Sequence, residues 1–240
     1  MDIGYETDQL LNEYLLMHYG SSNLQMPWGF GPVPGVHFPV RTVLHFPDIE
    51  VGRALDLGCA VGRSSFELSR MSKEVVGIDF SANFIRSARE IGKNREVLYM
   101  VKETGQQKIK AVARLPDGCF AERCHFIQGD VLDLPDGLGR FDRVHAANLI
   151  CRLSDPDQLL MRLPDLVVQG GDLVLATPCT LLDEFTTKHK QSYHDTFEWL
   201  KQKLSSEFHL RKQANEPFLI RETARKFQWA VSLVTHWQKV

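Results

Sequence analysis

The stretch RALDLGCAVGRSSFELSRM, residues 53–71, decides the fold class. Its apolar run from Ala54 to Leu57 predicts a short buried strand, and Gly58 permits the tight turn that follows. Phe66 and Leu68 then lie on the inward face of a helical pattern. The stretch therefore predicts a strand, a glycine-bearing loop and a helix, in that order.

The same succession follows at once in EVVGIDFSANFIRSAREI, residues 74–91. Here Val75 to Ile78 form the predicted strand, Asp79 ends it, and Ser81 is the expected helix N-cap. Further strands are predicted in CHFIQGD, FDRVHAANLI and GDLVLATP, with a helix over residues 158–168 before the last of them. Strands that alternate with helices predict an α/β fold with a doubly wound, mostly parallel sheet.

The end of the chain departs from this alternation. EFHLRKQ and KFQWAVSLVTHW are both strand-like, and ANEPFLIRETAR between them is too short for a crossover helix, so we expect an antiparallel pair. An inserted β-hairpin is predicted over residues 95–115, where two alternating runs flank Thr104 to Gln107. This hairpin is rich in Lys and Arg, and a solvated edge, a homodimer contact or a lid would each explain it.

Composition limits the class of partner. The chain carries 28 Lys and Arg against 30 Asp and Glu, so its charge gives no reason to expect a nucleic acid or an anionic membrane. A small-molecule partner is expected instead. No apolar run approaches the length of a membrane span, and the first residues do not form a signal peptide. Residues 1–240 are interpreted as a single domain, with residues 1–50 as an N-terminal substrate cap.

The five cysteines are odd in number and contain no C-x-x-C pair, which argues against a disulfide framework and a zinc ribbon. Free thiols are typical of a reducing compartment, so a cytoplasmic location is expected. Cys119, Cys124 and His125 could be considered as metal ligands, but no second cluster lies at a usable spacing. We therefore expect no metal site.

A nucleoside site is predicted where the first two strands end. Asp56 closes the first strand, Gly58 allows the turn, and Gly62 would let an anionic ligand approach the next helix. Asp79 closes the second strand about twenty residues further on, where a carboxylate can accept from both hydroxyls of a ribose. The dinucleotide fingerprint G-x-G-x-x-G fails, because alanine and arginine stand at its second and third glycine positions.

The pattern resembles motif I of the class I S-adenosylmethionine-dependent methyltransferases, except that alanine replaces the usual middle glycine. The resemblance implies a Rossmann-like fold and S-adenosylmethionine as cofactor, with S-adenosylhomocysteine as its product. QGDVLDLP then resembles the adenine motif, and AANLIC would lie near the methionine end. The cofactor-binding residues implied by this resemblance are Asp56, Gly58, Cys59, Ala60, Gly62, Asp79, Phe80, Asp130, Val131, Asn148 and Leu149.

The N-terminal stretch YETDQLLNEYLLMHYG, residues 5–20, is expected to form an amphipathic helix over the acceptor pocket. Tyr14 and His18 fall on one face of this helix together with two leucines. The alternative is a core helix whose tyrosine and histidine are satisfied internally. ANLI stands where enzymes that methylate exocyclic amines of nucleic acids carry (D/N/S)-P-P-(Y/F), so a nucleic-acid acceptor loses support.

Three segments, YETDQLLNEYLLMHYG, VARLPDG and PFLIRETARKFQWAV, resemble the 4-mercaptohistidine N1-methyltransferase family of ovothiol biosynthesis. The same module occurs fused behind the iron-dependent 5-histidylcysteine sulfoxide synthase, whereas this chain begins at the module and is expected to be a standalone enzyme. The resemblance implies an imidazole nitrogen of 4-mercaptohistidine, also called 5-thiohistidine, as the nucleophile and ovothiol A as the product.

Such a site has mainly to position its acceptor, because the sulfur is a stronger nucleophile than the ring nitrogen and must be turned away. An arginine could take the acceptor's carboxylate, and a carboxylate could take its ammonium. The expected catalytic residues are Tyr14, His18 and Asn148, and the expected acceptor-binding residues are Glu6, Arg41, Arg152, Arg221 and Glu222. An internal salt bridge is the alternative for Arg221 and Glu222.

Two other functions fit the same sequence. The first is a small-molecule O- or N-methyltransferase of another pathway. The second is a non-catalytic, cofactor-binding regulatory subunit whose basic hairpin contacts RNA or a partner protein.

Overall fold

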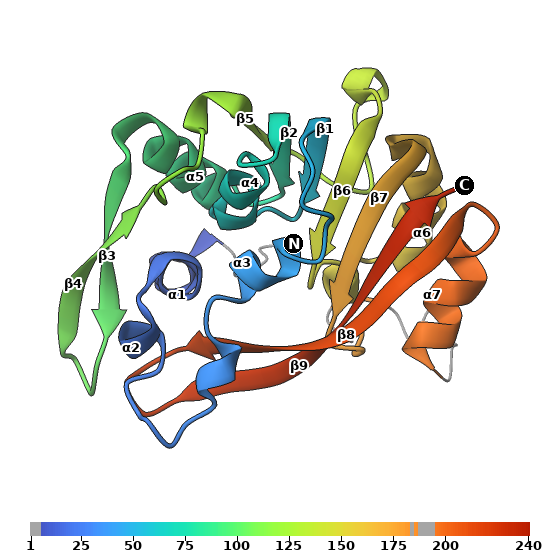
Figure 1. The fold of residues 1–240 in the computed structure, drawn as a ribbon. Coiled ribbons are helices and arrows are strands. Elements are labelled where there is room, and N and C mark those ends of the chain that lie inside the picture. Colours follow the sequence, from blue (N-terminus) through green and yellow to red (C-terminus); the bar gives the residue numbers. More distant parts are fainter. Residues whose placement is uncertain (1–5, 183–184, 187–194) are drawn as a thin grey trace.

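The computed structural model describes residues 6–182, 185–186 and 195–240, and it has a seven-stranded sheet at its centre (Figure 1). The strands lie in the order β5-β2-β1-β6-β7-β9-β8. Their bounds are β1 Val51–Leu57, β2 Ser72–Asp79, β5 Cys124–Gln128, β6 Phe141–Ala147, β7 Val167–Thr177, β8 Phe208–Arg221 and β9 Phe227–Lys239. The strands β5, β2, β1, β6 and β7 pair in parallel, whereas β9 pairs antiparallel with both β7 and β8. The predicted Rossmann-like α/β fold class is confirmed.

Helices cover both faces of the sheet. They are α1 Asp8–Tyr19, α2 Ser22–Gln25, α3 Phe38–Val43, α4 Arg63–Leu68, α5 Ala82–Asn94, α6 Pro156–Leu166 and α7 Thr196–Leu204. Leu55 and Leu57 of β1 pack into the layer under α6 and α7, around the buried ring of Trp237. Ala54, whose side chain points to the other face of the strand, packs into the opposite layer with residues of α1, α3 and α4. The carboxyl ends of β1, β2 and β6 therefore meet at one edge of a rigid sheet.

Helix boundaries follow local capping chemistry. Ser81 is the N-cap of α5, as predicted, and its hydroxyl accepts from the Phe84 amide at 3.2 Å. The helix predicted over 158–168 begins two residues earlier, at Pro156, and ends at Leu166. Asp155 caps it, and proline suits the first helical position because the amide there needs no partner.

The inserted hairpin is present as a separate two-stranded sheet of β3 (Glu96–Lys102) and β4 (Lys108–Arg114). Tyr99, Val101 and Ala113 on its inner face are buried in the same cluster as residues of α1 and α5. Asn12 of α1 reinforces this packing, because its side-chain oxygen accepts from the Met100 amide at 2.7 Å. Helix α1 thus lies between the hairpin and the main sheet (Figure 1).

The segment between the last two strands differs from the expectation. ANEPFLIR is part of β8, which pairs with β9 from Phe208 to Arg221, and only residues 222–226 form the turn. This segment contains Asn215 and Pro217, residue types that are depleted in strands and typical of turns, so its sequence does not predict a strand. Arg221 is the last residue of β8 and therefore lies at the tip of a long hairpin, which reaches beneath α1 (Figure 1).

Two absences concern the described part of the chain. None of its helices is both long enough and apolar enough to cross a membrane. Nor does it bring three or more His, Cys, Asp or Glu side chains together in an arrangement that could hold a metal ion.

Candidate active site

The loop after β1 turns sharply because three of its residues adopt left-handed backbone angles. Gly58 has φ 70°, Ala60 has φ 47° and Gly62 has φ 85°. The amides of Gly58 and Cys59 both donate to the Ile78 carbonyl, at 2.8 and 3.0 Å, which ties this loop to the end of β2. A side chain makes the left-handed region unfavourable, so the conformation of Ala60 needs support from outside the loop.

Asp79 supplies that support. Its Oδ2 accepts from the Ala60 amide at 2.8 Å, and its Oδ1 accepts from the Ser81 amide at 2.9 Å. The carboxylate therefore joins the loop after β1 to the start of α5. Burial raises the pKa of Asp79 to about 6, although both amide hydrogen bonds favour the charged form. Each carboxylate oxygen keeps a further lone pair that a hydroxyl donor can use.

The carboxylate of Asp56 has a different environment, because its hydrogen-bond partners are side chains and not backbone amides. It is 1% exposed, its Oδ2 accepts from the hydroxyls of Ser64 and Ser65 at 2.8 and 2.6 Å, and its Oδ1 lies 2.8 Å from Nδ1 of His145. Asp56 therefore fixes the start of α4 to β6. Its direct contact with the cofactor stays a prediction.

The sequence analysis did not identify His145, the histidine in this network. Nε2 of His145 lies 3.0 Å from Oγ1 of Thr42 in α3, so the network extends from the glycine loop to the N-terminal cap. The available signal is a histidine inside the otherwise apolar end of β6, because a polar side chain on a buried central strand requires partners.

Gly62 is required by packing. A Cβ atom there would lie 2.8 Å from Cζ of Phe126 and 2.9 Å from Cβ of Ala88, so any side chain would push β5 and α5 away. This reason differs from the expected one, close approach of a ligand. Both could hold together, and the assignment of Gly62 to the cofactor stays a prediction.

The expected adenine residues lie in two adjoining loops. Phe80 follows Asp79 and has a side chain that is 57% exposed, which is unusual for a phenylalanine. The Gly129 amide donates to the Asp79 carbonyl at 3.0 Å, which holds the loop after β5 beside the end of β2. Asp130 is exposed in that loop, and Val131 is buried beneath it.

The loop after β6 closes the opposite side of the glycine turn. A Cβ at Gly58 would lie 3.0 Å from Cδ1 of Leu149, so the two residues are in close contact. Asn148 has a left-handed φ of 54°, its amide donates to the Ala176 carbonyl at 2.8 Å, and its Oδ1 accepts from Oγ of Ser232 at 2.7 Å. Its side-chain oxygen is therefore committed to β9.

One face of α1 is turned toward the glycine loop. His18 is 6% exposed, and its Nδ1 has no hydrogen-bond partner among the described residues. Burial, with a smaller contribution from Arg63, lowers the pKa of His18 to about 3. The Tyr14 ring lies 5.9 Å from the His18 ring and 4.7 Å from the Phe84 ring. Tyr19 fixes the end of the helix, because its hydroxyl donates to the Val61 carbonyl at 2.8 Å.

Glu6, expected at the acceptor, lies at the start of α5. Its Oε1 accepts from the Ala82 amide at 3.0 Å, and its backbone carbonyl accepts from Nδ2 of Asn83 at 2.9 Å. Glu6 also contributes to the raised pKa of Asp79, which places it on the Asp79 side of the site. The segment from Glu6 to Tyr19 therefore runs from the end of β2 to the glycine loop.

The expected acceptor cations are engaged within the protein. Arg41 forms an ion pair with Glu216 at 2.8 Å and also donates to the carbonyls of Val36 and Pro217. The guanidinium of Arg152 lies over the Phe185 ring, 5.8 Å from its centroid. Neither observation identifies an acceptor contact, so both assignments stay predictions.

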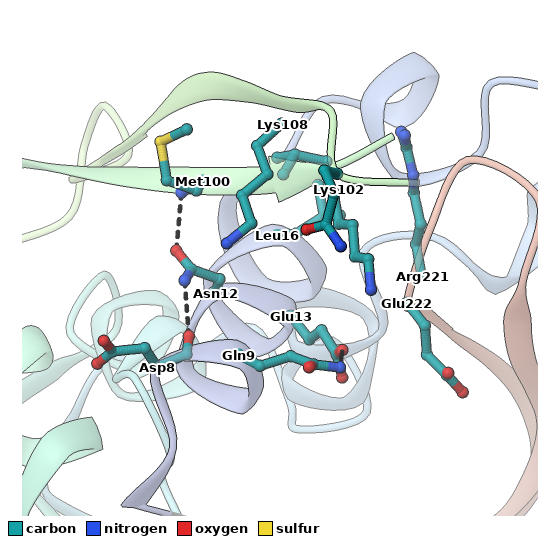
Figure 2. Close-up of a pocket in the computed structure, with 12 residues that line it drawn as sticks. Asp8, Gln9, Asn12, Glu13, Leu16, Met100, Lys102, Lys108, Arg221 and Glu222 are labelled. Carbon is teal, nitrogen blue, oxygen red and sulfur yellow. Dashed lines mark hydrogen bonds between the residues drawn. The ribbon is translucent and has the colours of Figure 1, made fainter. Parts of the chain in front are cut away.

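Arg221 and Glu222 lie on the far side of α1 from Tyr14 and His18. They line a cavity of about 280 Å³ together with Asp8, Gln9, Asn12, Glu13 and Leu16, which form the opposite face of the helix (Figure 2). The Arg221 side chain is 2% exposed and pairs with Glu103 at 2.6 Å. The structure therefore places Tyr14 and His18 on one side of α1 and Arg221 and Glu222 on the other.

The comparisons with known proteins agree with this geometry. A profile of the methyltransferase domain family matches residues 50–222, from the start of β1 past the tip of β8. The chain belongs to this methyltransferase domain family. The N-methyltransferase NodS from Bradyrhizobium japonicum WM9, in complex with S-adenosylhomocysteine, has TM-score 0.55 and 15% identity, covering 95% of this chain and 98% of NodS.

A second solved structure is magnesium protoporphyrin IX methyltransferase ChlM from Synechocystis PCC 6803 with bound S-adenosylmethionine. Its TM-score is 0.55 at 13% identity, over 98% of both chains. The uncharacterized protein syc1184_c of Synechococcus sp. is 28% identical over 156 residues, which are 61% of this chain and 32% of that protein. The chain thus spans about a third of this relative. The family match confirms the methyltransferase domain that the motif predicted, and the solved structures share its fold.

Proposed function

We propose that this protein transfers the methyl group of S-adenosylmethionine to an imidazole ring nitrogen of 4-mercaptohistidine. One observation carries the proposal. A neutral, buried imidazole, that of His18, lies against the glycine loop with an unpartnered Nδ1 within the described residues, beside the phenol ring of Tyr14. An uncharged donor or acceptor can hold a heteroaromatic acceptor in one orientation without adding charge to the site.

The residues at the carboxyl edge of the sheet fit the cofactor. Asp79 would accept from the ribose hydroxyls, and Phe80, Asp130 and Val131 would surround the adenine. Gly58, Cys59, Ala60 and Gly62, braced by Asp56, would hold the methionine portion together with Asn148 and Leu149. The raised pKa of Asp79 supports this assignment, because perturbed carboxyl groups gather at functional sites. When bound, S-adenosylmethionine supplies an electrophilic methyl group on a sulfonium centre.

The work of the chain is then to position the acceptor. A neutral imidazole has an unperturbed pKa near 6.5, so its ring nitrogen carries a free lone pair at neutral pH and no strong general base is needed. The acceptor's sulfur is the competing nucleophile and has to be held away from the methyl group. Tyr14 and His18 are the proposed orienting residues, since their rings lie together on one face of α1 and Tyr14 packs against the cluster that contains Cys59 and Ala60 of the glycine loop.

The choice of 4-mercaptohistidine rests on the resemblance of the terminal segments and of VARLPDG to the ovothiol family. NodS, by its name an N-methyltransferase, provides a solved example of nitrogen methylation on this fold. A small heteroaromatic amine without a carboxylate is the second candidate acceptor. Arg41 is already paired with Glu216 and Arg221 with Glu103, so neither arginine offers an unpaired cation to an acceptor carboxylate.

The test is turnover by the full chain. S-adenosylmethionine and 4-mercaptohistidine are incubated with the protein, and mass spectrometry with fragmentation distinguishes ring N-methylation from S-methylation. We expect the N-methyl product from the wild type, slower turnover with Tyr14→Phe and His18→Gln by roughly tenfold or more, and some S-methyl product. Histidine serves as the acceptor that lacks sulfur. Absence of any transfer by a protein that binds S-adenosylhomocysteine in calorimetry would overturn the acceptor assignment while leaving the cofactor assignment intact.

A further inference from the structure

The cavity between α1, the inserted hairpin and the tip of β8 is a second site, separate from the cofactor site. Its volume of about 280 Å³ lies near the lower end of the range for small-molecule pockets. Besides the helix residues, its lining includes Met100, Lys102 and Lys108 of the hairpin and Arg221 and Glu222 of β8 and the following turn. Three segments distant in the sequence therefore enclose one space.

Helix geometry separates this cavity from the methyl-transfer site. With about 3.6 residues per turn, Gln9, Asn12 and Leu16 project to one side of α1, whereas Tyr14 and His18 project to the other. The first group lines the cavity. The second packs toward α5 and the glycine loop. A ligand in the cavity would therefore contact the face of α1 that is turned away from the glycine loop.

The helix side of the cavity offers a buried carboxylate. Glu13 is 9% exposed, and its Oε1 accepts from Nε2 of Gln9 at 2.9 Å. Its second oxygen has no hydrogen bond within the described residues. Burial raises the pKa of the Glu13 carboxyl above its ordinary value, because a desolvated carboxylate lacks compensation for the lost water. An ammonium group at this place would provide that compensation.

The hairpin side offers cations. Lys102 and Lys108 extend toward the cavity from the paired ends of β3 and β4, opposite Glu13 and Gln9 (Figure 2). Neither lysine forms an ion pair within the part of the chain that the structure describes. By contrast, Arg221 is paired with Glu103 at 2.6 Å, and Glu222 is paired with Lys226 at 2.6 Å. The two lysines are therefore the groups available to a ligand carboxylate.

We propose that this cavity binds a free α-amino acid, with its ammonium at Glu13 and its carboxylate at Lys102 and Lys108. The two opposed charges of such a zwitterion match the opposed charges of the cavity walls. A dianion such as a phosphate ester would place negative charge beside Glu13, and a simple amine would leave both lysines unmatched. The cavity volume also suits a molecule of this size.

Calorimetry on the full chain loaded with S-adenosylhomocysteine tests the proposal. The common protein amino acids are titrated one at a time, and the strongest binder is compared with its decarboxylated amine and its deaminated acid. We expect saturable binding of an amino acid and loss of about tenfold or more in affinity for each truncated probe. Absence of binding by every amino acid at millimolar concentration would overturn the proposal.

Variants then locate the site. Glu13→Gln and the double variant Lys102→Met/Lys108→Met keep the bulk of the side chains, and each should weaken amino-acid binding about tenfold or more. His18→Gln, on the opposite face of α1, is the matched control and should leave this affinity unchanged. If His18→Gln abolishes binding and the cavity variants do not, the amino acid occupies the acceptor pocket, and the cavity is not its site. The readout is binding alone, so failure of methyl transfer would not affect it.

Discussion

Nδ1 of His145 and Oδ1 of Asp56 lie 2.8 Å apart, and each side chain is 1% exposed. This contact joins β6 to the carboxyl end of β1, immediately before the glycine loop. Because Thr42 lies 3.0 Å from the other ring nitrogen, the same histidine also connects the loop to α3. The N-terminal cap is thereby attached to the cofactor edge of the sheet by a buried polar network as well as by apolar packing.

Removing the carboxylate of Asp56 should be costly. Asp56→Ala leaves Ser64, Ser65 and His145 without their common acceptor, so we expect a loss of about 3 kcal/mol or more in the free energy of unfolding. Ser64→Ala removes one donor and leaves the others, and should cost about 1 kcal/mol. Urea denaturation measures both. Equal losses for the two variants would show that the network has no central member.

Cofactor affinity should depend on pH through Asp79. Its raised pKa of about 6 means that the carboxyl is protonated below that pH, and only the ionised form can accept from both ribose hydroxyls. Affinity for S-adenosylhomocysteine should therefore rise with pH through about 6, with proton release on binding that calorimetry in two buffers detects. Asp79→Asn should weaken binding by roughly 1 to 3 kcal/mol and remove the pH dependence. A flat wild-type profile would exclude Asp79 as the ribose acceptor.

The stability of the fold should also depend on pH, through His18, and it should likewise rise with pH. Its folded-state pKa of about 3 lies below that of an unfolded histidine, so between about pH 3 and 6.5 the unfolded chain binds a proton that the folded chain does not. Because the folded state holds His18 neutral, the free energy of unfolding therefore decreases as the pH falls from about 6.5 to about 3. His18→Gln should make this decrease in the free energy of unfolding smaller by a few kcal/mol, as measured by urea denaturation at a series of pH values. His209→Gln, at an exposed position on β8, is the control and should keep the wild-type slope.

The parallel core could be predicted because strands such as Val75 to Ile78 are buried on both faces and are therefore apolar throughout. The predicted cofactor residues come together because Asp56 and Asp79 stand at the carboxyl ends of β1 and β2, and parallel strands bring those ends to one edge. Local sequence carries both kinds of information. The second half of β8 was missed because Asn215 and Pro217 are typical of turns and interrupt the strand pattern there.

The acceptor residues could not be placed in this way, because their relation depends on how distant segments pack. Arg221 and His18 come from opposite ends of the chain, and only the position of α1 decides that they lie on different sides of it. The same holds for His145, whose partners Asp56 and Thr42 belong to two other elements. No periodicity in the sequence encodes such a meeting.

Substitution of Phe80 should affect cofactor binding without affecting the stability of the fold. Its side chain is 57% exposed, so Phe80→Ala should change the free energy of unfolding by less than about 0.5 kcal/mol. If the ring stacks on adenine, the same substitution should weaken S-adenosylhomocysteine binding by about 1 kcal/mol. Leu98→Ala, 70% exposed on the hairpin, is the control for nonspecific effects of removing a surface apolar group. Unchanged cofactor affinity in Phe80→Ala would remove Phe80 from the adenine site.

Substitution of Glu6 tests whether this residue supports the cofactor site or the acceptor pocket. Its carboxylate accepts from the Ala82 amide at the start of α5, beside Asp79 and on the far side of the glycine loop from Leu149. Glu6→Ala should therefore weaken cofactor binding by about 1 kcal/mol, through loss of an anchor at the ribose side, and leave the acceptor KM unchanged. Asp8→Ala, at an exposed position on the first turn of α1, should change neither quantity. A raised acceptor KM with normal cofactor affinity would instead return Glu6 to the acceptor pocket. Complete removal of residues 1–20 is a poorer experiment, because it deletes Leu15 and Leu16, which are 1% and 2% exposed in the core.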